Sequence, residues 1–318
     1  MTVTVEIIAD SISPMGIRLT TLRWRYPKFI HGEAKTHRKM RIADRAYELL
    51  QEVGVMDDPA LSRNASSSRA IPVNRLINDV LNDPAIPSFS GANVPGMQPG
   101  DPLPTHVRDR LIRIWLDERD SAVERAREMA ACGAAKQDVN RIIEPWSHIN
   151  VVVSATDWQN FFSLRDHPMA QYEIQELARA TKREMAGSTP KLLQPGEWHL
   201  PFVDIATDID KLPTRPADSD MFWEAWFALG LIKLSAARCA RVSYMTHEGK
   251  EPDANADIAL YDRLVGSAPL HASPTEHQAT PDSIQETGAW RAHHEWGNFY
   301  GWRQHRKMLI GESAVEKR

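Results

Sequence analysis

Hydrophobic and polar positions follow two periods along this chain, which predicts both strands and helices. Residues 3–12 alternate and are rich in β-branched side chains, which is typical of a strand. Residues 148–156 contain three consecutive valines, which favours a strand buried on both faces. Residues 21–31 mix aromatic and β-forming residues around Pro27 and predict a second strand or a strand-to-helix junction.

Apolar positions at helical spacing predict long helices in much of the remaining chain. The expected helices are residues 41–53, 105–132, 135–143, 156–165, 168–186, 218–244 and 257–267. The candidate N-caps are Thr105, then Thr156 or Asp157, then Asp218 or Ser219. Pro168 is expected in the first turn of its helix, and Gly133 and Gly187 are expected just after helix ends.

Few strands separated by long helices predict a helix-rich α+β fold. Six prolines between residues 82 and 104 predict an extended loop, and residues 188–217 are also expected to form loops, with a possible short strand at 197–203. The chain lacks the GxGxxG and GxxxxGK[ST] patterns, so the usual dinucleotide and P-loop phosphate cradles are not expected.

Composition excludes several classes of protein. With 38 basic and 42 acidic residues among 318, the net charge is −4, which argues against a protein that coats nucleic acid but permits a local basic pocket. No apolar run approaches the roughly 18 residues of a membrane span, and the N-terminus lacks the pattern of a secretory signal. Two cysteines cannot form a disulfide framework, so we expect a cytoplasmic protein with reduced thiols.

Several polar clusters are candidates for chemistry, and each also has a purely structural interpretation. Residues 62–70 contain four Ser, one Asn and two Arg, which fits either a surface turn or an anion cradle. Arg165 precedes a helix N-terminus, where it can bind an anion or pair with Glu173. Residues 273–276 read as a capping box, and the neighbouring histidines do not have the spacing of a metal site.

Arginines also occur in three further segments, and the sequence pattern does not decide whether they are solvated or belong to a site. Residues 36–38 and 304–306 are basic triplets that can also be solvated helix faces. Residues 238–244 can be a helix end that packs in the core while Arg241 is solvated.

Together these segments resemble the flavin-dependent thymidylate synthase family. The family hallmark reads RHR and then SxNExSxRY, and residues 36–38 (THR) and 62–70 (SRNASSSRA) are similar to its two parts. Residues 160–178 read NFFSLRDHPMAQYEIQELA, which is close to the family segment NFLxLRxxxxAQxEIRxxA. ARVSY at 240–244 resembles ARxSY, and LHASPTEH at 270–277 resembles GHxSPxEH.

The order of these motifs differs from the family order, since ARVSY and SPTEH follow the other two here. The chain therefore looks like a circularly permuted, phage-like member, with a single catalytic domain over residues 1–318 and a helical insertion at 39–61. The triplet that faces the flavin is either 36–38, which leads into the hallmark and is favoured, or 304–306, which follows SPTEH as in the family.

The resemblance implies a central, mostly antiparallel sheet and a homotetramer with sites between subunits. It implies FAD as cofactor, dUMP as substrate, and methylenetetrahydrofolate and NADPH as co-substrates, with no metal, membrane or nucleic-acid partner. The implied catalytic residues are Arg165, Ser67 and His277. The implied dUMP-binding residues are Arg69, Ser67, Ser66, Arg165 and Gln171. The implied flavin-binding residues are His37, Arg38, Ser62, Asn64, Asn160, Glu276, His305 and Arg306.

Departures from the family pattern keep two alternatives open. Ala65 and Ala70 replace the Glu and Tyr of the hallmark, and the first Arg of RHR is Thr36 or Gln304. One alternative is a related flavin and folate enzyme that makes a 5-hydroxymethyl-pyrimidine deoxynucleotide. The other is a non-catalytic nucleotide-binding homologue.

Overall fold

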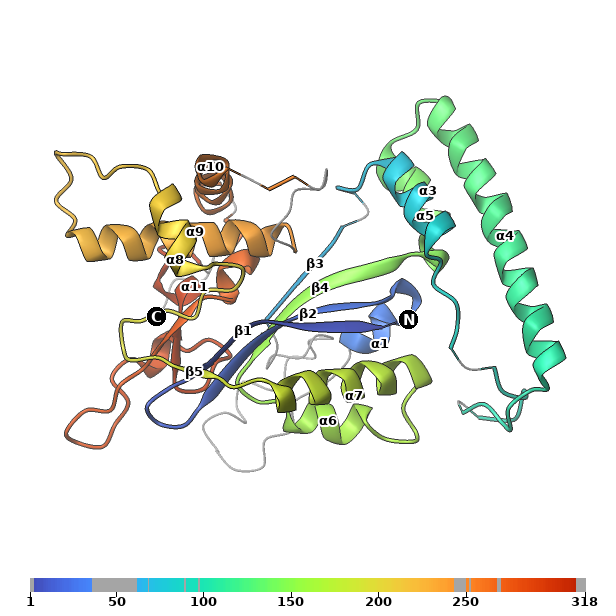
Figure 1. Cartoon of the computed structure of the whole chain (residues 1–318), viewed down its shortest axis with the longest axis horizontal. Coiled ribbons are helices and arrows are strands. Elements are labelled where there is room, and N and C mark those ends of the chain that lie inside the picture. The colour runs from blue at the N-terminus through green and yellow to red at the C-terminus, as the bar shows by residue number, and fades with distance from the viewer. Residues whose placement is uncertain are drawn as a thin grey trace.

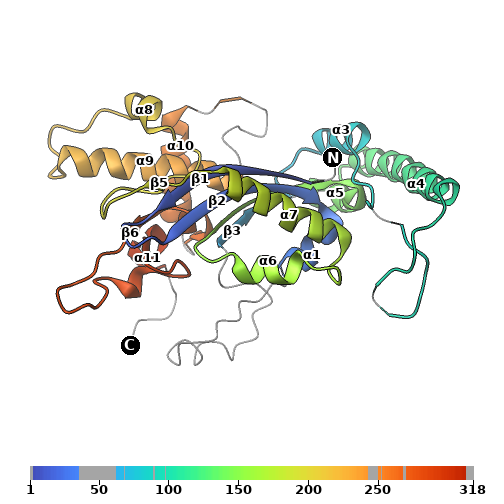
Figure 2. The same cartoon turned by 60° about the horizontal axis from the view of Figure 1, so that its bottom comes forward.

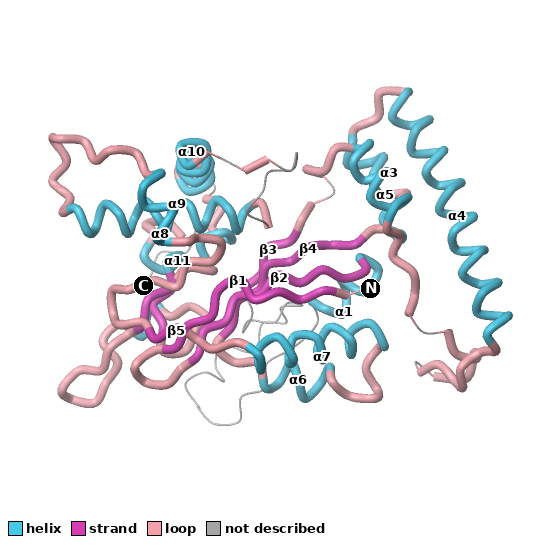
Figure 3. Tube along the Cα trace, in the orientation of Figure 1, coloured by secondary structure: helices cyan, strands magenta, loops and turns pink. Residues whose placement is uncertain are grey.

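The centre of the molecule is a five-stranded sheet (Figures 1 and 3). The computed structural model describes residues 3–35, 62–67, 69–88, 90–96, 98–242, 250–251, 253–267 and 270–312. The strands are β1 (Thr4–Ile12), β2 (Arg18–Pro27), β3 (Ser62–Ala65), β4 (His148–Ala155) and β5 (Lys191–Leu192). Their spatial order is β3-β4-β2-β1-β5.

The sheet is mixed, and the predicted α+β class is confirmed. β1 pairs with β2, β2 with β4, and β3 with β4, all antiparallel, whereas β5 runs parallel to β1. The register of β1 against β2 shifts between Ile7 and Ala9. Such a bulge turns the following side chains to the other face of the sheet. Ser11 therefore faces away from the side that Ile7 faces.

Two helices cover one face of the sheet with an apolar core. These are α6 (Gln159–Arg165) and α7 (Tyr172–Gly187), which lie beside the strands in Figure 2. Alternate residues of β2 and β4 point toward them, which is the period expected of a strand. The core on this face includes Leu22, Trp24, Val151, Val153, Phe161, Ile174 and Leu177, each at most 2% exposed.

The opposite face carries elements from about the C-terminal third of the chain. Its elements are α8 (Ile205–Asp208), α9 (Trp223–Ala240), α10 (Ala254–Val265), β6 (Ala279–Pro281), β7 (Trp302–Gln304) and α11 (His305–Met308). Short 3-10 helices lie at Ile209–Lys211, Ser273–Glu276 and His293–Glu295. Val152, which alternates with the valines of the first core, packs here against Cys239 and Val242.

A buried ion cluster holds α9 to α8 and α10. Arg238 is fully buried and donates to Asp208 at 2.6 and 3.0 Å and to Asp257 at 3.2 Å. Burial by itself raises the pKa of Asp208, but hydrogen bonds and charge from Arg238 bring that pKa below its ordinary value. Removal of one partner from such a cluster is expected to destabilise the fold strongly.

A third group of helices projects from the sheet beside β4, and Figure 1 shows α4 extending away from it. It contains α3 (Val73–Asn82), α4 (Thr105–Ala131) and α5 (Lys136–Arg141), which share a small core that includes Trp146. α3 has no counterpart among the helices predicted from the sequence. Shorter elements at Lys28–Ile30, α1 (His31–Lys35) and Glu144–Trp146 join this group to the strands. No helix within the described ranges is both long enough and apolar enough to span a membrane.

Most predicted strands and helices are confirmed, but their predicted N-caps are wrong. Pro104 and Phe222 occupy the N-cap positions of α4 and α9, and neither helix has a side-chain cap. Trp158 caps α6, although Asp157 accepts a hydrogen bond from the N–H of Gln159. The segment 197–203 forms only an isolated bridge between His199 and Ala279.

The start of α7 also differs from the prediction. This helix begins at Tyr172 with Gln171 as N-cap, so Pro168 lies outside it, and Gly187 is its last residue. The amide of Gln175 donates to the carbonyls of Pro168 and Ala170 at 3.4 and 2.7 Å and holds the preceding turn in place. The helix expected at 41–53 lies outside the described residues.

Candidate functional site

Three motifs that are far apart in the chain meet at Asn64 of β3. The amide nitrogen of Asn64 donates to the carbonyl of Cys239 at 2.8 Å, at the end of α9. The hydroxyl of Ser273 donates to the amide oxygen of Asn64 at 3.2 Å. The capping-box interpretation is therefore wrong: Ala272 is the N-cap of the 3-10 helix, and Ser273 bonds across to β3.

The second basic triplet lies directly against this cluster. Arg306 forms an ion pair with Glu276 and donates to Glu312 at 3.2 Å. Gln304 is buried, and its amide donates to the carbonyl of Glu276 at 2.9 Å. This triplet is thus no solvated helix face. The triplet at 36–38, and with it His37 and Arg38, lies outside the described residues.

Two of the predicted site histidines are buried and neutral. His305 hydrogen-bonds the hydroxyl of Tyr261 at 2.8 Å, and burial lowers the pKa of His305 to about 4. His277 is fully buried, with its Nδ1 2.9 Å from the hydroxyl of Ser154. Burial, and to a smaller degree the nearby His199, lowers the pKa of His277 to about 3. At neutral pH each ring therefore carries one proton and no charge.

The ARVSY motif begins in a strained conformation. Val242 has a φ of +60° and packs against Phe202, whose φ is +62°. A β-branched residue with positive φ is rare and costs about 1–3 kcal/mol, and such strain clusters at functional sites. Arg241 pairs with the buried Asp257, so the interpretation that Arg241 is solvated is wrong.

The buried Cys239 does not have the properties of a nucleophile. Burial raises the pKa of the Cys239 thiol far above its ordinary range, so the reactive thiolate is not formed. Cys132 is exposed at the end of α4. Across the described ranges, no group of three or more His, Cys, Asp or Glu side chains is placed to hold a metal ion.

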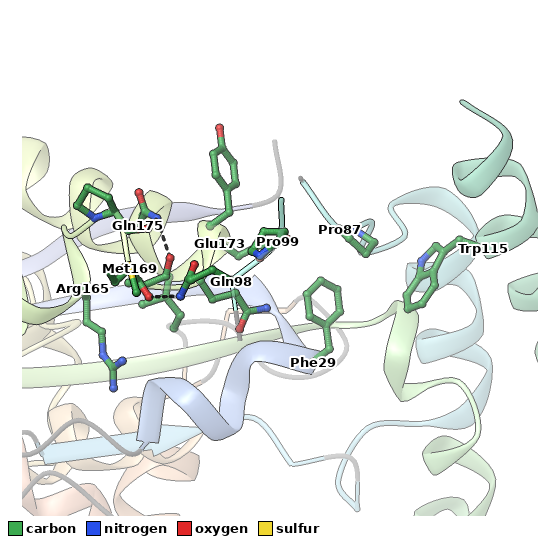
Figure 4. Close-up of a pocket in the computed structure, with 14 residues that line it drawn as sticks. Phe29, Pro87, Gln98, Pro99, Trp115, Arg165, Met169, Glu173 and Gln175 are labelled. Atoms are coloured by element: carbon green, nitrogen blue, oxygen red, sulfur yellow. Dashed lines mark hydrogen bonds between the residues drawn. The ribbon is translucent and has the colours of Figure 1, made fainter. Parts of the chain in front are cut away.

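A large pocket lies on the other side of the molecule, at the turn between α6 and α7 (Figure 4). Its volume is about 1010 Å³. Arg165 and Gln171 line it together with Phe29 and Trp115, and the Pro-rich loop forms one wall through Pro87, Gln98 and Pro99. The amide of Gln98 donates to the carbonyl of Met169 at 2.6 Å, which fixes the loop to the turn.

A buried carboxylate also ties the Pro-rich loop to α7. Glu173 is 4% exposed and accepts a hydrogen bond of 2.8 Å from the backbone N–H of Ser88. The interpretation in which Arg165 and Glu173 simply pair is therefore replaced by a contact between Glu173 and the loop. The loop residues were missed by sequence reasoning, because their proline content predicts a loop but not which element it contacts.

The remaining predicted residues lie at the end of β3 and on α6. Ser66 exchanges hydrogen bonds with Asn150 of β4, while Ser67 and Arg69 are exposed in the following turn. The backbone of Ser62 pairs with Ser154, and Asn160 lies in the first turn of α6. Of the described residues predicted to bind dUMP, only Arg165 and Gln171 line the large pocket.

Comparisons with known proteins agree with the motifs. Residues 85–191 match the model of a family described as "Thymidylate synthase complementing protein". The predicted resemblance to the thymidylate synthase family is confirmed. The matched segment contains the Pro-rich loop, β4, α6 and α7, and so most of the residues that line the large pocket.

Comparisons with curated proteins and with solved structures give no further information about function. No curated protein matches the chain. Two solved structures of a UMP/dUMP methylase, PolB from Streptomyces cacaoi, bound with 5-Br UMP and 5-Br dUMP, have a TM-score of 0.39 and sequence identities of 13% and 12%. The likeness covers 58% of this chain and 88% and 90% of those chains. At this TM-score it carries no conclusion about function.

Proposed function

We propose that the chain is a flavin-dependent enzyme that methylates C5 of dUMP and yields dTMP. Methylenetetrahydrofolate provides the carbon and leaves as tetrahydrofolate, and NADPH is the reductant. The observation that carries this proposal is the family match over residues 85–191, because its segment around Arg165 and Gln171 lines the large pocket. The contact between Asn64 and Ser273, which joins two further motifs, supports it independently.

The residues of this chain suit a nucleotide with a phosphate and a pyrimidine. The hydroxyls of Ser66 and Ser67 and the guanidinium of Arg69 are grouped in one turn, and such groups bind phosphate. Arg165 is proposed to contact the pyrimidine edge and to stabilise negative charge on the ring, with Gln171 beside it. Ser67 and His277 are the other proposed catalytic residues.

The size and the aromatic walls of the large pocket support FAD as the cofactor. A volume of about 1010 Å³ is at the upper end of ordinary cofactor sites, and Phe29 and Trp115 offer aromatic walls. FAD, when bound, supplies the redox chemistry, while the protein binds and orients it. The residues proposed to hold FAD are Asn64, Asn160, Glu276, His305 and Arg306, together with His37, Arg38 and Ser62.

The proposed homotetramer would bring separated parts of the site together. Arg165 and Gln171 lie on the side of the sheet covered by α6 and α7, whereas Glu276 and His277 lie on the side of α9. Residues from two subunits that face each other can complete one site. This arrangement supports sites between subunits, and the mass of the assembly in solution tests it.

Spectroscopy and product analysis test the function. The purified protein is expected to be yellow, and its flavin absorbance should bleach on addition of NADPH and dUMP. A colourless protein that does not take up FAD contradicts the proposal and favours a non-catalytic homologue. With methylenetetrahydrofolate present, mass spectrometry should find dTMP; a hydroxymethylated nucleotide as main product would instead support the related enzyme.

A variant tests the proposed phosphate site. Arg69→Ala is expected to weaken dUMP binding by about 2–5 kcal/mol, because it removes one partner of a charged pair that the bound nucleotide desolvates. Isothermal titration with dUMP measures the change. Arg127→Ala is the matched control, since Arg127 is an exposed arginine on α4 that pairs with Glu124. Equal dUMP affinity in both variants would show that the phosphate binds elsewhere.

A further inference from the structure

Five buried polar side chains form a continuous hydrogen-bonded chain across the face of the sheet that lies opposite α6 and α7. Ser11 Oγ lies 2.8 Å from His199 Nδ1, and His199 Nε2 lies 2.8 Å from Thr21 Oγ1. Thr21 Oγ1 lies 2.5 Å from Ser154 Oγ, which lies 2.9 Å from His277 Nδ1. Each of the five residues is at most 5% exposed. We name this set the hydroxyl–imidazole chain.

The strands place these groups in line. Thr21 and Ser154 are directly opposite each other in the antiparallel pairing of β2 and β4. The bulge in β1 turns Ser11 to the same face. His199 is held beside the strands because its backbone N–H donates to the carbonyl of Ala279 at 2.8 Å. The chain thus crosses β1, β2 and β4 and ends at the SPTEH motif.

The hydroxyl–imidazole chain ends at His277 Nε2. This atom is fully buried and has no hydrogen-bond partner among the described residues. A buried polar atom without a partner costs about 1–3 kcal/mol, so in a native protein such an atom is usually bonded to an ordered water, an ion or a ligand. The next residue, Glu276, pairs with Arg306, and Ser273 contacts Asn64. His277 thus directly follows Glu276, one of the residues proposed to bind FAD.

We propose that Ser11, His199, Thr21 and Ser154 are positioning residues that relay a proton to and from His277 Nε2, where a bound ligand gives or takes it. This inference rests on the proposed function, because that function supplies the ligand. A hydroxyl donates one proton and accepts others, and a neutral imidazole donates from one nitrogen and accepts at the other. The hydroxyl–imidazole chain can therefore form all of its hydrogen bonds in two ways, which differ in the direction of donation.

In the first arrangement every bond is donated toward His277. Ser11 donates to His199 Nδ1, His199 Nε2 to Thr21, Thr21 to Ser154, and Ser154 to His277 Nδ1, so the His277 proton is on Nε2. When Nε2 gives that proton to a ligand, each of the four bonds passes one proton in the same direction, and Ser11, the most exposed member, takes up one from water. All four bonds are then reversed, and Nε2 is an acceptor.

Charge explains why a relay is needed at this position. Burial lowers the pKa of His199 and of His277 to about 3, so neither ring holds a second proton near neutral pH. The charge of Asp10 raises the pKa of His199 only slightly against the effect of burial, so an imidazolium remains costly in this buried site. The passage of a proton through the whole chain changes what His277 Nε2 offers, but it leaves no charge in the interior.

Nitrogen NMR of the full-length protein labelled with ¹⁵N-histidine tests the relay without any ligand. The ring nitrogen shifts show which nitrogen carries the proton, and the variants His277→Gln and His199→Gln assign the signals. In the wild type both arrangements are expected to be populated, so the shifts of His277 should be averaged. Ser11→Ala removes the acceptor for a proton on His199 Nδ1, so it disfavours the reversed arrangement and should move the His277 proton to Nε2, although Ser11 is four hydrogen bonds away.

Loss of a hydroxyl in the middle of the hydroxyl–imidazole chain should abolish the response of the His277 shifts to Ser11→Ala. In a Thr21→Val background, Ser11→Ala should leave the His277 shifts unchanged, whereas Thr21→Ser should preserve the response. Thr181→Val is the matched control, because Thr181 is a fully buried threonine of α7 outside the chain. If Thr21→Val does not fold, Ser154→Ala breaks the same chain one bond nearer His277. Unchanged His277 shifts in Ser11→Ala, or an equal response with Thr21→Val, would overturn the relay.

Turnover separates this inference from the proposed function. Thr21→Val should lower kcat at least about tenfold, a part of the 10²–10⁴ that general acid–base catalysis contributes, with KM for dUMP unchanged and with rescue by Thr21→Ser. Coupled ¹⁵N shifts in a protein without this activity would contradict the proposed function alone. Normal activity without coupled shifts would contradict the relay alone.

Discussion

The two faces of β2 and β4 are built from neighbouring residues but have opposite chemistry. On one face Leu22, Trp24 and Val153 belong to an apolar core under α6 and α7. On the other face Thr21 and Ser154, each adjacent in sequence to one of those core residues, belong to a buried polar chain. This apolar core gains stability from burial of its side chains. The polar face gains little from its hydrogen bonds but loses much if one is left unmade.

The largest expected effect is on the apolar face. Trp24→Ala should reduce the free energy of unfolding by about 3–5 kcal/mol, because it leaves a cavity beside Phe161 and Trp158, whose rings lie 5.2 and 5.9 Å from that of Trp24. Urea denaturation measures the loss. Trp223→Ala, at a tryptophan that is 52% exposed, should cost about 1 kcal/mol or less. Equal losses in the two variants would show that the apolar face does not dominate stability.

A smaller effect is expected when the polar face loses one hydroxyl and keeps its shape. Thr21→Val should reduce the free energy of unfolding by about 1–3 kcal/mol, because His199 Nε2 and Ser154 each lose a buried partner. Urea denaturation is again the measurement, with Thr21→Ser as the variant that should retain most of the stability. If Thr21→Val leaves the free energy of unfolding unchanged, the stability of the polar face does not depend on the hydrogen bonds of Thr21.

Part of the pH dependence of stability should arise on the polar face. His199 and His277 have pKa values lowered from 6.5 to about 3 in the folded protein. As the pH falls below 6.5, the unfolded chain binds protons that the folded chain does not, so stability falls between about pH 6.5 and pH 3. Each histidine contributes a slope of about 1.4 kcal/mol per pH unit in this window.

His199→Gln should remove the contribution of one histidine to that slope. Unfolding free energies at pH 7, 6 and 5 give the slope for the wild type and the variant. His106→Gln, at an exposed histidine of α4, is the control and should keep the wild-type slope. A slope that does not change in His199→Gln would show that this ring is already protonated in the folded protein.

The smallest expected effect has the opposite sign. Thr181 lies on the apolar side of α7, fully buried, and its hydroxyl has no partner among the described residues. Thr181→Val should leave the free energy of unfolding unchanged or raise it by up to about 1 kcal/mol, because an unmet hydrogen bond is removed without loss of shape. A loss as large as that in Thr21→Val would mean that the two faces do not differ in this respect.

Local patterns predicted much of the fold correctly. The three valines of β4, the alternation in β1 and the helical spacing of α4 and α7 each depend on burial of one face or one stripe, which the order of residues records directly. The N-caps were predicted poorly. Pro104 precedes α4, and the side chain of Arg215 holds the turn before α9 through the carbonyl of Met221, neither of which the local pattern shows. α3 was missed although it buries Leu76, Ile77 and Val80 at helical spacing.

The motifs were also recognisable, because residue type and spacing carry the resemblance that the family match confirmed over residues 85–191. The residues that the motifs contact in the folded protein could not be predicted from the sequence. Ser273 looked like a local cap, yet it bonds to Asn64, and Arg241 looked solvated, yet it pairs with Asp257. Each of these partners is distant in the sequence, and no local pattern marks it.

The sequence by itself therefore determined the α+β class, most elements and the family resemblance, since these follow from periodicity and from short runs of specific residues. Only the tertiary structure decided that Ser11, Thr21, Ser154, His199 and His277 form one chain. Those residues come from separate segments, and an ordinary serine or threonine in a strand carries no mark of its partner. A one-residue bulge in β1 is enough to turn Ser11 toward that chain, because the side chains of a strand alternate between its two faces.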